Sequence, residues 1–422
     1  MKFKKLIIFI ITFILFFLLN PCCYASNNVT LDISAESAIL INSSTGQILF
    51  AKNENQQRYP ASTTKILTAI LAIENCNLDE KVTASYNAVM AIPSGYSNAE
   101  IRVGEELTVK ELLELFLIHS ANEVGYILAE HISGTFSDFA DLMNQKLSEL
   151  GCINTHFTNP SGLHDKNHYS TAYDLSLIAK YCMQNTTFRN IVSMPSCTIS
   201  ETEKHDKRFF LNTNDMLNPK SKYYNEYIIG IKTGYTSQAK NCLISGYKKD
   251  NTELISVVLG SPQNAPNGLS GKFVDTKTLF DFGITNFSNK TIASKNQVLT
   301  QVKIEHATPN TQNLDLLLEN DINALVSNSI DLADIEPEIK LIENLSAPIT
   351  QNTVLGTVTY TIDGFSYTEN LIASHSVEGF TFLEIILKLF FAIIILFIIY
   401  ELMYSKKTKK SHKKYLYRKI KY

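Results

Sequence analysis

The sequence has few cysteines, and their spacing marks neither a metal site nor a disulfide framework. Five of the seven cysteines follow residue 25, and no two form a C-x-x-C pair. An odd number of cysteines without paired spacing indicates neither a zinc site nor a full set of disulfides. We therefore expect them to be mostly buried small apolar residues. These five are Cys76, Cys152, Cys182, Cys197 and Cys242.

Positive charge is scarce between the two ends of the chain. The net charge of the 422 residues is −3, but residues 405–422 carry nine Lys or Arg and residues 1–25 carry three Lys, with no acid in either segment. Removing these twelve positive charges leaves −15 for residues 26–404. An acidic body argues against nucleic acid as a partner. The length allows two or three domains, and no internal repeat is present.

The first 25 residues have the pattern of a secretory signal peptide. Lysines precede an apolar run from Leu6 to Leu19, and the small residue Ala25 comes before a polar stretch. The alternative is an uncleaved membrane anchor. A proline before Cys22 argues against a lipoprotein signal. We expect residues 1–25 to be removed on export.

The C-terminal end predicts a membrane anchor. Residues 380–404 are strongly apolar, without interruption from 389 to 400, and the basic tail 405–422 follows. The positive-inside rule places such a tail in the cytoplasm and everything before it outside. A helix lying on the membrane surface is the alternative. We expect a single-pass protein of the cell membrane with its main domain extracytoplasmic.

Residues 28–289 predict an α+β domain, with one antiparallel sheet flanked by helices. Two apolar runs around a Gly-containing turn indicate a β-hairpin over 37–50, and strands return near the end of the domain. Thr171 to Asp174 fits a capping box that opens a helix, which we favour over a catalytic role for Asp174. The later strands are expected at 227–236, 242–247 and 254–259, and helices at 66–73, 108–118, 124–132, 135–150, 171–182 and 272–282.

Residues 290–378 predict a second, smaller and mainly β domain. Apolar and polar residues alternate over 298–304 and 354–362, and Asp363-Gly364 is typical of a hairpin turn. The chain is therefore expected to consist of a signal peptide, two domains, a membrane helix and a basic tail.

Ser62 and Lys65 stand where an almost wholly apolar helix begins. A helix without a polar face is buried, and Lys65 lies three residues on, over the same face as the Ser62 hydroxyl. A lysine in an apolar site has a lowered pKa and can take the proton of a serine nucleophile. S-x-x-K occurs four times, and serine is also a common helix cap, so the motif alone does not decide. Of the four, only Ser62 opens a buried helix.

Two more motifs follow in order. Ser120-Ala121-Asn122 falls at a junction between two buried helices, where polar side chains are expected only if they face a cleft. There Ser120 could relay a proton, and Asn122 could hold a substrate amide and orient Lys65. Lys232-Thr233-Gly234 lies on a predicted strand and occurs once. Lys232 would depress the pKa of Lys65, Thr233 could bind a substrate carboxylate, and Gly234 would let substrate lie close to the strand.

The three motifs together resemble the penicillin-binding protein and serine β-lactamase superfamily. The middle motif has Ala121 where S-D-N has aspartate. The segments Pro60–Lys65, Phe157–Leu163 and Gly230–Thr236 are similar to those of the D-alanyl-D-alanine carboxypeptidases among the low-molecular-mass penicillin-binding proteins. The resemblance covers about residues 28–375.

This resemblance implies a serine peptidase that removes the terminal D-Ala of peptidoglycan stem pentapeptides through an acyl-enzyme. Ser62 would be the nucleophile and Lys65 its base, with Ser62 and Tyr235 N–H groups as the oxyanion hole. It also implies no metal or cofactor, and β-lactam antibiotics as covalent inhibitors. Two positions depart from the family. Lys240 stands where glycine is usual, and Lys272 is the nearest candidate for an arginine whose forked guanidinium it cannot reproduce.

Three alternatives remain at this point. A class A β-lactamase needs a deacylating glutamate after the middle motif, and residues 157–165 contain none. A non-catalytic wall-binding protein on the same fold would tend to lose Ser62, Lys65 or Lys232. D,D-endopeptidase or transpeptidase activity uses the same residues and stays open, because only the leaving group or acyl acceptor differs.

Overall fold

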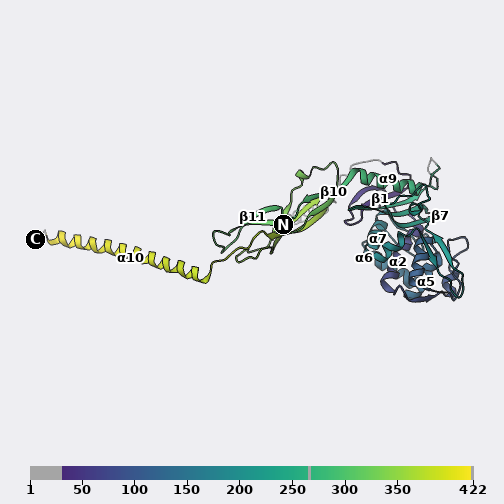
Figure 1. Cartoon of the computed structure of the whole chain (residues 1–422), viewed down its shortest axis with the longest axis horizontal. Helices are drawn as coiled ribbons and strands as arrows, with labels where there is room; N and C mark the ends of the chain where they lie inside the picture. Colours follow the sequence, from purple (N-terminus) through teal and green to yellow (C-terminus); the bar gives the residue numbers. More distant parts are fainter. Residues whose placement is uncertain (1–30, 265–267, 420–422) are drawn as a thin grey trace, which may run out of the picture. The chain divides into compact units, whose positions relative to one another are not determined.

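The computed structural model of the protein describes residues 31–264 and 268–419, which divide into two compact units (Figure 1). The first unit contains the residues up to 248 together with 253–282, and the second contains 249–252 and the residues from 283 onward. The expected signal peptide, residues 1–25, lies outside the described residues.

The first unit is built on a five-stranded sheet in the order β2-β1-β9-β8-β7. β1 pairs antiparallel with β2 and with β9, and β7 pairs antiparallel with β8. In Figure 1, helix α9 lies on one side of this sheet, and α2, α5, α6 and α7 lie on the other. The α+β fold predicted from the sequence is confirmed. The strands are β1 Ser37–Asn42, β2 Ile48–Lys52, β7 Ile228–Thr236, β8 Lys240–Lys249 and β9 Thr252–Ser261.

Each predicted helix of this unit is present, but α8, over Thr186–Val192, was not predicted. The helix expected over 108–118 continues from α4 into a π-helix and ends at His119. The longer helices are α2 Lys65–Asn75, α4 Val109–Glu114, η2 Leu115–His119, α5 Asn122–Ser133, α6 Phe136–Glu149, α7 Ala172–Gln184, α8 Thr186–Val192 and α9 Gly271–Asn286.

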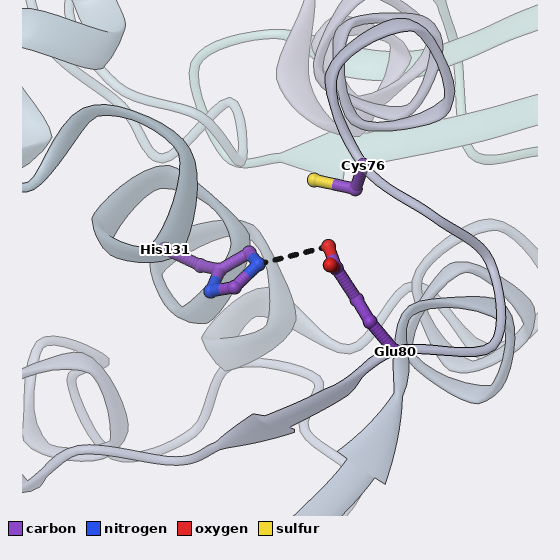
Figure 2. A group of neighbouring side chains, drawn as sticks. All are labelled: Cys76, Glu80 and His131. Carbon is purple, nitrogen blue, oxygen red and sulfur yellow. Dashed lines mark hydrogen bonds and ion pairs between the residues drawn. The ribbon is translucent and has the colours of Figure 1, made fainter.

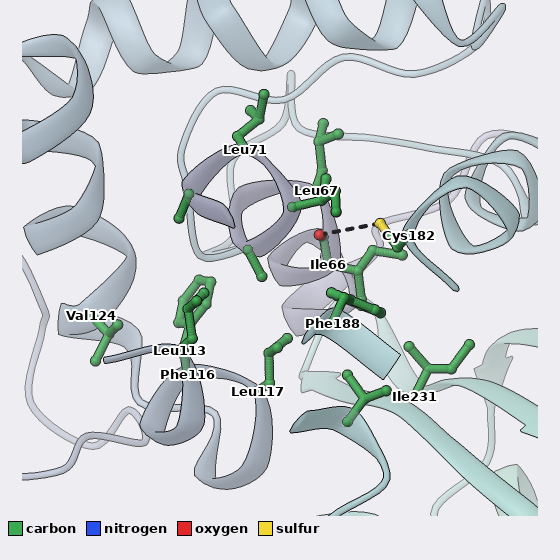
Figure 3. Packing of buried hydrophobic residues seen from close by; sticks show 14 of the residues in the cluster. Ile66, Leu67, Leu71, Leu113, Phe116, Leu117, Val124, Cys182, Phe188 and Ile231 are labelled. Carbon is green, nitrogen blue, oxygen red and sulfur yellow. Dashed lines mark hydrogen bonds between the residues drawn. The ribbon is translucent and has the colours of Figure 1, made fainter. Parts of the chain in front are cut away.

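Helix α2 runs through the middle of the core. Every residue from Lys65 to Ala72 is buried, as the absence of a polar face predicts. Figure 3 shows Ile66, Leu67 and Leu71 among side chains of the neighbouring helices, including Phe116. Because the core holds α2 on all sides, the residues at its N-terminal end have fixed positions.

Several helices begin directly after a threonine whose side chain caps the first turn. The Thr108 hydroxyl accepts a hydrogen bond from the Glu111 N–H, and the Glu111 carboxylate accepts one from the Thr108 N–H, which completes a capping box. Thr171 caps α7 by accepting from the Asp174 N–H. The buried Asp174 carboxylate, however, accepts from the Asn154 N–H and the Thr155 hydroxyl, and so fixes the preceding loop rather than closing a box.

Residues 76–107, where no helix or strand is predicted above, contain short elements. Strands β3 and β4 have three residues each and form a two-stranded sheet, and α3 has five residues. Elements this short do not complete enough periods to leave a pattern. They are β3 Lys81–Thr83, α3 Tyr86–Met90 and β4 Glu106–Thr108.

A second small sheet lies further along the chain. It is formed by β5 Ser196–Ile199 and β6 Arg208–Leu211, and the 3₁₀ turn η3 Asp215–Leu217 follows it.

The second unit is mainly β, as expected, and ends in a long helix. Its larger sheet has the order β11-β12-β16-β15-β14, and β10 pairs with β13. The Asp363-Gly364 turn joins β15 to β16. The elements are β10 Phe287–Ala293, β11 Val298–Lys303, β12 Asn313–Leu318, β13 Ile322–Ser327, η4 Leu332–Asp334, β14 Glu338–Leu341, β15 Val354–Ile362, β16 Phe365–Ala373 and α10 Phe382–Lys419.

Within α10, the stretch Phe382–Lys407 is long and apolar enough to cross a membrane, and it is the one such helix in the described residues. Its 26 residues extend about 39 Å, which exceeds the roughly 30 Å of a bilayer's hydrocarbon core.

Candidate active site

Ser62 lies in a 3₁₀ turn, Ala61–Thr64, directly before α2. Ala61 has φ +50°, a conformation that costs an L-residue about 1 kcal/mol or more. The turn is held by two hydroxyls, since Thr63 donates to the Pro60 carbonyl and Thr64 donates to the Ala61 carbonyl. The Ser62 hydroxyl is thus presented by a strained turn on a rigid helix.

The Lys65 amine is fully buried and has three oxygen neighbours. Nζ lies 2.9 Å from the Ser62 hydroxyl, 2.7 Å from Asn122 Oδ1 and 2.6 Å from the Ser161 carbonyl oxygen. The Phe116 ring covers the amine, with its centroid 5.4 Å away. The predicted proximity of Ser62 and Lys65 is therefore present.

The orientation of Asn122 follows from its other contact. Its side-chain nitrogen donates to the Ser97 carbonyl at 2.7 Å, and its own backbone N–H donates to the same oxygen. A carbonyl only accepts, so the amide nitrogen faces Ser97 and the amide oxygen faces Lys65. The expectation that Asn122 orients Lys65 agrees with this contact.

The charges around Lys65 favour its neutral form. Burial holds the pKa of Lys65 well below its usual range, and the Lys232 charge adds to this, while Glu123 acts in the opposite direction. Burial also lowers the pKa of Lys232 to about 7, assisted by the charge of Lys272. A neutral amine beside a serine hydroxyl has the lone pair that a general base needs.

Strand β7 forms the opposite wall of the site. A Cβ built on Gly234 would lie 3.0 Å from the Ser62 backbone nitrogen, so this strand approaches Ser62 as closely as glycine allows. The Lys232 amine donates to the Thr233 carbonyl, and the Thr233 hydroxyl lies 2.6 Å from that of Thr213. Tyr235 is 57% exposed at the end of this row.

Ser120 occupies the bend between η2 and α5. Its backbone is left-handed, with φ +67°, and the residue is buried. Among the described residues, its hydroxyl has no hydrogen-bonding partner. It therefore keeps both its donor and its acceptor capacity for a bound molecule, two residues from Asn122.

A family of proteins described as D-alanyl-D-alanine carboxypeptidase matches residues 24–263. The chain belongs to this family. The C-terminal domain of penicillin-binding protein 5 matches residues 287–379. Membership agrees with the resemblance drawn from the three motifs.

The relatives of this carboxypeptidase-family protein cover most of its length. It is 35% identical to the D-alanyl-D-alanine carboxypeptidase DacF of Bacillus subtilis, over 81% of this chain and 85% of the relative. It is 29% identical to DacA of Haemophilus influenzae, over 79% and 82%. The crystal structure of penicillin-binding protein 5 from Haemophilus influenzae superposes with a TM-score of 0.64 and 27% identity, over 83% of this chain and 99% of that one.

Two residues of this site were not predicted to take part in it. The Ser161 carbonyl contacts Lys65, but a backbone atom leaves no mark on a sequence beyond the turn-forming residues around it. His168 is buried, which lowers its pKa to about 3, and its Nδ1 accepts from the Thr158 N–H. Its Nε2 therefore carries the proton and donates to the Thr64 hydroxyl, which supports the turn around Ser62.

The two departures from the family pattern have physical explanations. Lys240 has φ +58°, where glycine is unstrained, and its amine pairs with the Glu36 carboxylate at 2.5 Å. Lys272 is close enough to Lys232 to lower its pKa, and burial lowers the pKa of Lys272 itself. Lys272 therefore adds positive charge beside Lys232.

Proposed function

We propose that this protein is a membrane-anchored serine D-alanyl-D-alanine carboxypeptidase that removes the terminal D-Ala from peptidoglycan stem pentapeptides. The observation that carries the proposal is the buried Lys65 amine, 2.9 Å from the Ser62 hydroxyl, in a chain of this family. The relatives DacF and DacA are D-alanyl-D-alanine carboxypeptidases, which indicates the reaction class.

Acylation begins with proton transfer from Ser62 to Lys65. A neutral amine has two N–H groups and one lone pair, and two of its three neighbours, Asn122 Oδ1 and the Ser161 carbonyl, can only accept. Both N–H groups are thereby used, and the lone pair is left facing the Ser62 hydroxyl. As Oγ bonds to the carbonyl carbon of the penultimate D-Ala, its proton passes to Nζ.

The leaving group then needs a proton, which Ser120 would supply. The Lys65 ammonium returns its proton through the Ser120 hydroxyl to the nitrogen of the departing D-Ala, and the C–N bond breaks. The oxyanion would be stabilised by the Ser62 and Tyr235 N–H groups, and one such donor is typically worth about 10²–10³ in rate. Water then attacks the ester, with Lys65 again as base, and releases the shortened peptide.

Substrate recognition rests on β7. The terminal carboxylate would bind near Lys232, Thr233 and Lys272, where positive charge and a hydroxyl are concentrated. The substrate backbone would lie along Gly234, and Asn122 would hold the amide beside the scissile bond. A β-lactam carries a carboxylate and a reactive amide, so the same groups would bind it and form a long-lived acyl adduct with Ser62.

We also propose an arrangement in the cell. Residues 1–25 would direct export, and the peptidase unit would act outside the membrane on the wall. Phe382–Lys407 supports an anchor by its length and composition. The nine positive charges of residues 405–422 favour a cytoplasmic tail.

The test is release of D-alanine from a stem pentapeptide by the full-length chain purified in detergent. Wild type should release D-alanine and be labelled covalently by penicillin, and Ser62→Ala should do neither. The matched control is Ser237→Ala, which alters another S-x-x-K motif in an exposed turn and should retain both activities. Penicillin labelling without D-alanine release would show that the substrate is wrong. Absence of both would overturn the proposal.

A further inference from the structure

Cys76, Glu80 and His131 direct their side chains toward one point (Figure 2). The Cys76 sulfur, a Glu80 carboxylate oxygen and a His131 ring nitrogen all lie within 4.8 Å of one another. His131 Nε2 is 3.0 Å from Glu80 Oε1, and burial, with the nearby Glu80 carboxylate, raises the pKa of the Cys76 thiol to about 11. No step of the proposed peptidase reaction uses these groups.

The three residues come from three different elements. Cys76 caps the C-terminal end of α2, His131 lies in the last turn of α5, and Glu80 directly precedes β3. The C-terminal end of a helix carries partial negative charge, which favours a cation near it. Two such ends and one carboxylate meet at this cluster.

The donor set is that of a zinc ion. Thiolate, imidazole and carboxylate are its usual protein ligands, at about 2.3, 2.0–2.1 and 2.0–2.2 Å. In a tetrahedral site these bond lengths separate the ligand atoms by roughly 3.3–3.7 Å. The ligand atoms lie up to 4.8 Å apart, about 1.5 Å more than such a site requires, so metal binding would have to draw the three side chains together by rotation. His131 is exposed and the other two are half-buried, so an ion and a water ligand can enter.

We propose that Cys76, Glu80 and His131 form a site for one Zn²⁺ ion, with water as the fourth ligand. Binding forms a Zn–S bond as the thiol proton leaves to water. Nε2 binds through its lone pair once its proton has moved to Nδ1. The carboxylate exchanges its hydrogen bond with His131 for a bond to the metal.

Such an ion would join the far ends of the two helices that begin at the active site. Helix α2 starts at Lys65 and α5 starts at Asn122, and both end at the cluster after 11 and 12 residues, about 16–18 Å along. A ligand that binds the folded state alone stabilises it. Zn²⁺ would therefore raise the melting temperature of this unit without taking part in the chemistry.

The experiment uses the full-length, untagged chain in detergent, stripped of metal and titrated with Co²⁺ as a spectroscopic substitute for Zn²⁺. We expect a one-to-one complex with a thiolate-to-cobalt band in the near ultraviolet and the intense visible bands of four-coordination. Zn²⁺ should displace Co²⁺, abolish the bands and raise the Tm by a few degrees.

Variants assign the ligands. Cys76→Ser should lose the thiolate band. Cys76→Ser, His131→Gln and Glu80→Gln should each bind Co²⁺ at least about 10-fold more weakly, because even the loss of a residue that only supports a metal ligand costs this much affinity. Cys197→Ser and His156→Gln, which change a cysteine and a histidine outside the cluster, should behave as wild type, and circular dichroism should show every variant folded. The proposal is overturned if no one-to-one complex forms, if Cys76→Ser keeps the band, or if Zn²⁺ leaves the Tm unchanged. None of these readouts depends on peptidase activity.

Discussion

The Lys65 amine lies 2.6 Å from the carbonyl oxygen of Ser161, a residue 96 positions further along the chain. Together with Asn122 Oδ1, this oxygen accepts both N–H groups of a neutral amine and leaves the lone pair for Ser62. The loop containing Ser161 therefore sets the direction of the base, and the buried surroundings set its charge. A substitution in the loop or in the buried surroundings can therefore alter the direction or the charge of the base separately.

The first prediction concerns the charge of Lys65. The Glu123 carboxylate raises the pKa of Lys65 against the lowering by burial and by Lys232. Glu123→Gln removes that charge and keeps an acceptor for the Ala99 N–H. The pKa of Lys65 should fall further, so the neutral base should persist to lower pH. In a plot of the penicillin acylation rate against pH, the fall on the acid side (the acid limb) should therefore occur at lower pH.

Rates of acylation across the pH range, measured for wild type and Glu123→Gln, check this. Glu130→Gln, on the same helix, is the control and should keep the wild-type profile. An acid limb that stays in place or moves to higher pH in Glu123→Gln would contradict the assignment of Lys65 as the base.

The second prediction concerns substrate binding. The pKa of Lys232 is lowered to about 7, by burial first and by Lys272 second. As the pH rises through this value, Lys232 loses its proton and attracts a substrate carboxylate less, so kcat/KM should decline on the basic side. Lys272→Met removes one of the two causes that lower the pKa of Lys232, so that pKa should rise. The decline of kcat/KM on the basic side (the basic limb) should then occur at higher pH.

The matched variant is Lys272→Arg, which retains the charge and should retain the position of the limb. The pH dependence of kcat/KM for D-alanine release distinguishes them. If Lys272→Met and Lys272→Arg share one basic limb, then Lys272 does not act on Lys232. Both variants should leave the acid limb, which belongs to Lys65, where it is.

The third prediction concerns the loop that carries Ser161. Gly162 has φ +79°, and a Cβ there would lie 1.9 Å from the Ala61 carbonyl oxygen, so Gly162→Ala must displace either the loop or the Ser62 turn. The left-handed backbone costs about 1 kcal/mol and overpacking about 1–3 more, so stability should fall by about 2–4 kcal/mol. A shift of about 1 Å at the base can cost 10²-fold in rate, so acylation should fall steeply.

Gly151→Ala separates the two causes. Gly151 has φ +76° and nothing within 4 Å of its Cβ position, so the variant should lose about 1 kcal/mol and acylate normally. Thermal unfolding followed by circular dichroism and the rate of penicillin labelling provide the two readouts. Equal losses in both variants would show that the loop tolerates the added methyl group.

Much of the site could be predicted from side-chain types at fixed spacing. Ser62 and Lys65 are three residues apart on one helix, and helix geometry alone brings them together. The contribution of Ser161 could not be predicted, because a main-chain carbonyl has no residue signature. The role of His168 could not be predicted either, since a single histidine gives no indication that it will meet Thr64 across 104 residues.

In the fold, too, features set by residues close in sequence could be predicted, and features set by distant residues could not. The helix that begins after Thr108 and the buried character of α2 could be predicted, because each depends on near neighbours in the chain. The pairing of β1 with β9 joins segments more than 200 residues apart, which periodicity cannot show. The group Cys76, Glu80 and His131 likewise lacks any motif spacing, because two of its ligands end helices and one precedes a strand. The cysteine spacing predicts no zinc site, because that pattern detects sites with several cysteine ligands and this group has one.

The last prediction concerns Lys240, where the family usually has glycine. Its φ of +58° strains any L-residue by about 1 kcal/mol, while its half-exposed ion pair with Glu36 contributes about 0.2–1 kcal/mol. Lys240→Ala keeps the backbone strain and loses the ion pair with Glu36. Lys240→Gly loses both the strain and the ion pair. Lys240→Gly should therefore be more stable than Lys240→Ala by about 1 kcal/mol and close to wild type, as measured by thermal unfolding. High salt should narrow the gap between wild type and Lys240→Ala, because it screens the exposed pair, but should leave the gap between the two variants. If Ala and Gly variants unfold together, the backbone at 240 is relaxed and the family's glycine there needs another explanation.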